Sequence, residues 1–189
     1  MDKVEQFQDF KRLVLNEIDQ ALSPVDPFEV ETLVDAILSA HRVFVVAVGR
    51  VFLVMQAFAK RLTHLGLRVD PVGSITEHPI TRKDLLIAAS GSGETMFPVG
   101  IAKLAKKFHA KVALITASPR STLMDLCDLS VRIPCPTKLK LQGEATSIQP
   151  LTTLFDQSLL ILCDCISMII IKRRKIGRED LWRYHANLE

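Results

Sequence analysis

Small hydroxyl side chains and glycines gather in one stretch near the middle of the 189-residue chain, which reads SGSGET. Ser90, Ser92 and Thr95 offer hydroxyl donors, and Gly91 and Gly93 let the backbone turn tightly and approach a ligand closely. A helical pattern begins directly afterwards, so free backbone N–H groups and the positive end of a helix dipole point to the same place. The combination favours a phosphate site, although a simple turn with a helix cap would use the same residue types. It is neither a P-loop nor a GxGxxG dinucleotide motif.

The elements around this stretch alternate between two patterns. Short runs rich in apolar residues predict five strands, at 42–49, 67–73, 84–90, 111–117 and 129–134. Helical patterns separate several of them, at 52–65, 96–108 and 120–126. Near-continuous apolar strands that alternate with helices indicate an α/β fold, a three-layer doubly wound parallel sheet covered on both faces.

Helical patterns also occupy both ends of the chain. Two helices are expected within residues 1–40, separated by the sequence SPVDP, and further helices within 150–189, the first of them at 151–172. The length favours one domain over residues 1–189, with its sheet core at 42–134. The polar segment 135–150 is expected to be a long loop, which in a compact domain is usually functional.

Ligands of open α/β sheets bind at the carboxyl ends of the strands. Three predicted strands end in small or hydroxyl residues: the first in VGR at 48–50, the third in SGSGET, and the fourth in TASPRS at 116–121. Because these ends meet at one edge of a parallel sheet, we expect them to form a polar pocket.

Composition excludes several classes of protein. Hydrophobic residues make up 48% and charged residues 24%, which is typical of a globular protein, and the net charge of +3 is too small to indicate nucleic-acid binding. The chain opens without a secretory signal, so a cytoplasmic location with free, buried cysteine thiols is expected. No Cys or His spacing matches a zinc site. The apolar run 159–171 is too short to span a membrane and contains Asp164, so we interpret it as a core or subunit-interface helix.

The sequence resembles the sugar isomerase (SIS) domain, and within it most nearly the 6-phospho-3-hexuloisomerase branch. The resemblance rests on GR at 49–50, AFAKRLTHLG at 57–66, SGSGET, TASPRSTLMDLCDL, SIQPLTTLFDQ at 147–157 and HANLE at 185–189. It implies a flavodoxin-like fold with a five-stranded parallel sheet, usually in a homotetramer. It also implies interconversion of 3-hexulose 6-phosphate and fructose 6-phosphate through an enediol, in the ribulose monophosphate pathway, with no metal or organic cofactor.

The same resemblance assigns roles to single residues. The phosphate would be held by the hydroxyls and backbone amides of Ser90, Gly91, Ser92, Gly93 and Thr95. Arg50 would lie at the edge of the pocket. Asp156 would be the catalytic base, and His185 an acid/base or ring-opening group that reaches a pocket shared with a neighbouring subunit.

Four positions depart from the usual pattern of the branch. Val51 and Phe52 stand where the family usually has Ser and Gly, Thr152 replaces a Gly, and Asp156 replaces a Glu. The sequence ITEHP, at 75–79, also brings a glutamate and a histidine near the second strand. These departures leave open an isomerase for a different sugar phosphate, or a non-catalytic regulatory protein that binds phosphosugars.

Overall fold

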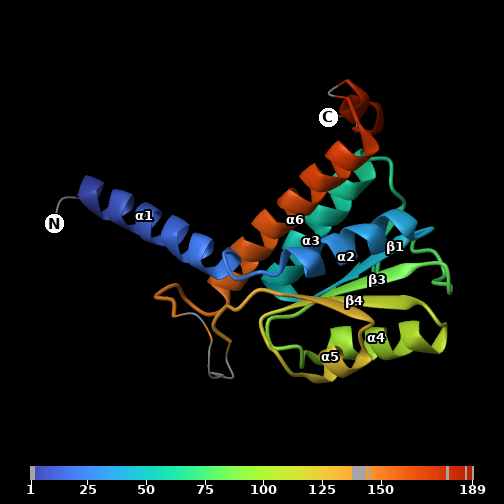
Figure 1. Ribbon diagram of the computed structural model, residues 1–189, viewed down its shortest axis with the longest axis horizontal. Coiled ribbons are helices and arrows are strands. Elements are labelled where there is room, and N and C mark those ends of the chain that lie inside the picture. The colour runs from blue at the N-terminus through green and yellow to red at the C-terminus, as the bar shows by residue number, and fades with distance from the viewer. Residues whose placement is uncertain (1–2, 138–143, 145, 178, 186, 189) are drawn as a thin grey trace.

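Five parallel strands form the centre of the computed structural model, which describes residues 3–137, 144, 146–177, 179–185 and 187–188 (Figure 1). The strands are β1 (Val43–Val46), β2 (Val69–Pro71), β3 (Leu85–Ala89), β4 (Lys111–Thr116) and β5 (Leu129–Arg132). Their order in the sheet is β2-β1-β3-β4-β5 and every neighbouring pair is parallel. The predicted doubly wound, flavodoxin-like sheet is therefore confirmed.

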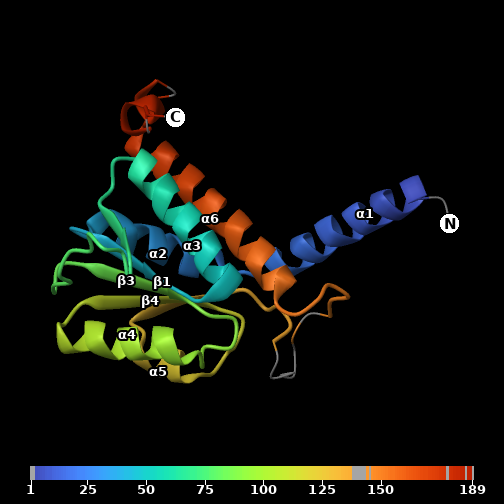
Figure 2. The same cartoon turned by 180° about the vertical axis from the view of Figure 1, so that it is seen from behind.

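Helices cover both faces of this sheet, as the two opposite views show (Figures 1 and 2). On one face lie α2 (Pro27–Ser39), α3 (Gly49–His64) and α6 (Thr153–Arg174), and on the other α4 (Met96–Lys107) and α5 (Thr122–Leu126). Alternate residues of one strand serve the two layers: Val43 and Val45 pack with the first group, Phe44 and Val46 with the second. Both faces are thus apolar, which explains the continuous apolar runs of the sequence.

The first helix, α1 (Lys3–Leu22), extends away from the rest of the protein (Figures 1 and 2). Its far half exposes Phe7 and Phe10, whereas its near half packs against α6, with Glu17 and Ala21 buried.

Helix α6 has the predicted length and begins and ends two residues later than predicted. Among the described residues it is the one helix long and apolar enough to cross a membrane, a property that it shares with core helices of soluble proteins. It packs here against α1, α2 and α3, and Phe155, Leu159, Ile166 and Ile170 are fully buried.

The strand and helix boundaries correct several predictions. Gly49 does not end the first strand but begins α3, with a φ of 59° that favours glycine. The second strand is only three residues long and lies at the edge of the sheet, where Pro71, which lacks a backbone N–H, is tolerated. The predicted final helix is a short 3-10 helix, η1 (Asp180–Tyr184).

Candidate active site

A cavity of about 270 Å³ lies at the carboxyl edge of the sheet, where β1 and β3 lead to helices on opposite faces. This is the point at which the strand order reverses, the usual ligand site of doubly wound folds. Its walls are formed by Val48, Gly49, Arg50, Val51, Ala89, Ser90, Gly91, Ser92, Thr95, Thr137 and Thr152. The structure thus brings together five of the six residues predicted to bind substrate; Gly93 is not among the lining residues.

Two helices begin at this cavity. Val48 precedes α3 and Thr95 precedes α4, and neither side chain caps its helix within the described residues. The first N–H groups of a helix have no intrahelical partner, and the helix dipole adds partial positive charge at the same end. The cavity therefore offers two converging sets of backbone donors to an anion.

The predicted hydroxyl donors form a small network at the start of α4. Ser90 Oγ lies 3.0 Å from Thr95 Oγ1 and accepts a hydrogen bond from the backbone N–H of Gly93 at 3.1 Å. Ser92 Oγ accepts only a long bond, from the N–H of Glu94 at 3.3 Å. Because a hydroxyl hydrogen can rotate, Ser92 can donate to an anion without losing that contact.

The end of β4 supports this loop and does not line the cavity, so the prediction that three strand ends form the pocket is wrong in that part. The backbone N–H groups of Ala117 and Ser118 each donate to the carbonyl of Gly91 at 3.1 Å. Thr116 Oγ1 donates to the same carbonyl at 3.3 Å. The third strand end fixes the shape of the loop from behind, and strand positions in the sequence could not distinguish these two roles.

The structure gives Gly93 a packing role that the sequence did not predict. Its φ is 68°, and a Cβ atom there would lie 2.0 Å from Ser121 Oγ. The glycine is required because the loop passes directly over Ser121, the N-cap of α5. The adjacent Glu94 strengthens the same junction, since its carboxylate accepts bonds from the N–H and the hydroxyl of Thr122, both at 2.7 Å.

The predicted base Asp156 is buried behind the cavity and forms an ion pair with Arg50. Arg50 Nε donates to Asp156 Oδ2 at 2.9 Å. Burial raises the pKa of Asp156 above its usual value, although the hydrogen bond and charge of Arg50 offset part of the effect. A carboxylate with a raised pKa is a stronger base than an exposed one, as proton abstraction from carbon requires.

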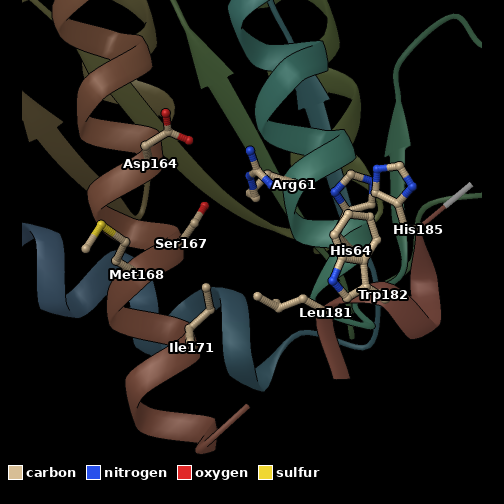
Figure 3. A pocket seen from close by; sticks show the side chains of 9 residues that line it. All are labelled: Arg61, His64, Asp164, Ser167, Met168, Ile171, Leu181, Trp182 and His185. Atoms are coloured by element: carbon tan, nitrogen blue, oxygen red, sulfur yellow. The ribbon is translucent and has the colours of Figure 1, made fainter. Parts of the chain in front are cut away.

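His185 lies in another part of the molecule. It lines a separate cavity between α3, α6 and η1, of about 540 Å³, with Arg61, Asp164 and Trp182 (Figure 3). Its ring stacks on that of His64, with centroids 4.9 Å apart. Within one chain the structure does not join His185 to the cavity that contains Arg50.

The residues that depart from the family pattern differ in whether they line the cavity. Val51 lines the cavity, whereas Phe52 packs against the hydrophobic core and is not among the lining residues. Thr152 lines the cavity as well. Glu77 accepts a bond from the N–H of Gly73, and His78 lies 2.9 Å from Asp70; neither is a lining residue.

Sequence reasoning missed Glu17 of α1, which holds the segment leading to α6. Its buried carboxylate accepts hydrogen bonds from Ser147 Oγ at 2.7 Å, Ile148 N at 3.0 Å and Gln149 Nε2 at 2.9 Å. Burial alone would raise the pKa of Glu17, but these bonds outweigh it and lower the pKa below 4.5. Glu17 thereby positions the residues just before Thr152. Its role is recognised from the burial of its side chain, which the sequence does not show.

We expect Glu17→Gln to lower the melting temperature by roughly 5 °C at pH 7, because one acceptor oxygen becomes a donor facing donors. The folded-state pKa is lowered, so the stabilisation is present above pH 4.5 and is lost as the pH falls through the folded value. The melting temperatures of the two proteins should therefore differ at pH 7 and converge in acid. Asp19→Asn, exposed on the same helix, is the control; an equal loss in both variants would contradict this role.

The cysteines show no reactive or metal-binding arrangement. Burial raises the pKa of Cys135 to about 12 and that of Cys163 further, so both are inert thiols. Cys165 is exposed and Cys127 half-buried, which corrects the expectation that all four are buried. Within the part of the chain that the structure describes, no three His, Cys, Asp or Glu side chains could hold a metal ion.

Residues 36–161 match the family described as the SIS domain. The chain belongs to the SIS domain family. It is 36% identical to the 3-hexulose-6-phosphate isomerase of Bacillus subtilis, over 93% of this chain and 95% of that one. The Mycobacterium gastri enzyme of the same name is 38% identical, over 94% and 88%.

Solved structures are also similar to this chain over most of its length. A Methanococcus jannaschii protein for which a 3-hexulose-6-phosphate isomerase function was inferred superimposes with a TM-score of 0.83, at 27% identity over 96% of this chain and 99% of that one. A second crystal structure, of a hypothetical protein, gives a TM-score of 0.87 at 31% identity, covering 96% and 97%.

Proposed function

We propose that this SIS protein is a phosphosugar isomerase that interconverts 3-hexulose 6-phosphate and fructose 6-phosphate. The observation that carries the proposal is the cavity between the N-termini of α3 and α4, where hydroxyl groups face the helix dipoles and a buried carboxylate lies behind Arg50. This arrangement suits a small anionic ligand with an adjacent base. The named relatives specify the substrate.

The reaction moves a carbonyl group from C3 to C2 of the hexulose. Asp156 takes the proton from C2, which gives an enediol, and returns it to C3. Ser90, Ser92, Thr95 and the helix N-termini hold the phosphate, so binding energy remote from the reacting carbons orients them. No redox cofactor is needed, since the oxidation of C2 balances the reduction of C3.

The oxygens at C2 and C3 also need proton donors as the enediol forms. On the family resemblance we propose His185 for this role, supplied to the cavity by a neighbouring copy of the chain. The chain would act as one domain over residues 1–189 within a homotetramer, in the cytoplasm and the ribulose monophosphate pathway. Exposed Phe7, Phe10 and Leu160 support a copy-to-copy surface. We expect light scattering at micromolar concentration to show an oligomer; a monomer would contradict it.

Turnover tests the proposed function directly. A synthase generates 3-hexulose 6-phosphate in place, and fructose 6-phosphate is measured as it forms; we expect robust turnover. Thermal stabilisation by fructose 6-phosphate without turnover would contradict the proposed isomerase activity and indicate a protein that only binds phosphosugars. Turnover with another sugar phosphate alone would overturn the substrate assignment.

Ser92→Ala tests the phosphate cradle, by which we mean the hydroxyl groups of Ser90, Ser92 and Thr95 together with the N-termini of α3 and α4. Hydrogen bonds to charged groups contribute about 1.5–3 kcal/mol, so we expect the Kd for fructose 6-phosphate to rise about tenfold or more. Ser74→Ala is the matched control, because Ser74 lies in the turn after β2 and is not among the cavity residues. Calorimetric titration measures both; unchanged affinity in Ser92→Ala would remove Ser92 from the site.

A further inference from the structure

The two members of the Arg50–Asp156 ion pair have very different surroundings. The side chain of Arg50 is 70% exposed and that of Asp156 is 4% exposed, although their atoms are 2.9 Å apart. Arg50 lines the cavity and Asp156 does not. The arginine therefore lies between the predicted base and the space that a substrate would occupy.

Asp156 is also incompletely satisfied. Its Oδ1 is buried and has no hydrogen-bond partner among the described residues, so Arg50 provides the stabilisation of this carboxylate through Oδ2 alone. Among the described residues, Arg50 of α3 is the charged group that acts on the pKa of Asp156, whereas Asp156 itself raises the pKa of Cys135, in the segment after β5. Glu144 acts on Cys135 in turn. The buried thiol is neutral, so Arg50 is the charge that sets the basicity of Asp156.

A phosphate in the cradle competes for the same guanidinium. Arg50 is in the first turn of α3, next to the helix N-terminus that faces the cavity. Its long, exposed side chain is free to turn, and a phosphate dianion attracts a guanidinium more strongly than a single carboxylate oxygen does. The interaction with Asp156 involves only Nε, so one hydrogen bond is broken when Arg50 leaves.

We propose that Arg50 exchanges partners on substrate binding, leaving Asp156 for the phosphate and so releasing the base only when a phosphorylated sugar is present. The inference rests on the proposed function, because it needs a phosphate in the cradle. Without a phosphate, Arg50 holds the pKa of Asp156 below the value that burial alone would give. In the complex the buried carboxylate loses its cation and gains proton affinity at the moment when it faces C2.

The exchange makes the phosphate a requirement for chemistry as well as for binding. A neutral hexulose would leave Arg50 on Asp156, and the carboxylate would not gain the additional proton affinity. An opposite charge beside a carboxylate commonly lowers its pKa by about 1–3 units, so we expect a rise of about one unit at this partly exposed pair.

Proton uptake on binding measures this exchange without requiring turnover. Fructose 6-phosphate is titrated into the protein by calorimetry between pH 4.5 and 7, in buffers of different ionisation enthalpy. We expect the wild type to take up more protons than Asp156→Asn, by about half a proton at the maximum for a one-unit shift. The phosphate group titrates equally in both proteins, so the difference reports Asp156.

Substitution of Arg50 separates this role from a structural one. In Arg50→Gln the carboxylate has no cation to lose, so the extra uptake should vanish, and Arg50→Lys should restore part of it. The acid limb of kcat/KM, which reports the free enzyme, should move about one unit higher in Arg50→Gln, whereas the limb of kcat should stay. A structural role would lower both parameters and shift neither limb.

The possible outcomes distinguish the exchange from the function. Binding heat with the same proton uptake in the wild type and Asp156→Asn overturns the exchange and leaves the phosphate cradle intact. The exchange is also contradicted if the extra proton uptake persists in Arg50→Gln. Absence of binding heat in all of these proteins overturns the cradle and the exchange together.

Discussion

Asp156→Asn should lower kcat by about 10²–10⁴, the usual contribution of a general base, without reducing the affinity for fructose 6-phosphate. The amide has the shape of the carboxylate but cannot take a proton from carbon. Asp156 is not among the cavity residues, so its loss should not disturb the phosphate contacts. Steady-state turnover gives kcat, and calorimetry gives the affinity.

The matched control is Asp164→Asn, two turns further along α6. Asp164 is exposed and lies at the separate cavity near η1. We expect near wild-type kcat in this variant. Wild-type turnover in Asp156→Asn would mean that another group is the base, whereas equal losses in both variants would indicate damage to α6.

Gly93→Ala should destabilise the protein by about 2–5 kcal/mol, the sum of a left-handed backbone for alanine and an overpacked contact. The new Cβ would lie 2.0 Å from Ser121 Oγ and 2.5 Å from Ser121 Cβ, so the loop or α5 must move. For a chain of this size we expect the melting temperature to fall by about 5 °C or more. Because the cradle loop is displaced, substrate affinity should fall as well.

Gly100→Ala provides a control of opposite sign. Gly100 is in α4, and a Cβ there meets no atom within 4 Å. Alanine favours a helix by about 1 kcal/mol relative to glycine, so this variant should be slightly more stable. Thermal melts of the two variants decide the point, and an unchanged melting temperature in Gly93→Ala would show that the junction with Ser121 is loose.

The sequence alone was sufficient for the fold class and for most of the residues that line the cavity at the start of α4. Buried strands of a parallel sheet are apolar on both faces, so β1, β3 and β4 are visible as continuous apolar runs. The cradle is equally local: Ser90, Ser92 and Thr95 lie within six residues, between one strand and one helix. Short-range patterns of this kind depend on neighbours along the chain.

Tertiary structure decided which distant groups meet. Arg50 and Asp156 are 106 residues apart, and Glu17 reaches Ser147 across 130 residues, so no local pattern links them. The use of Gly93 for packing on Ser121, and the position of His185 away from the cradle, likewise depend on how α5, α3 and α6 pack. Residue types and spacing along one segment determine local chemistry, whereas partners brought together by the packing of separate elements determine the charge, burial and proton affinity of the base.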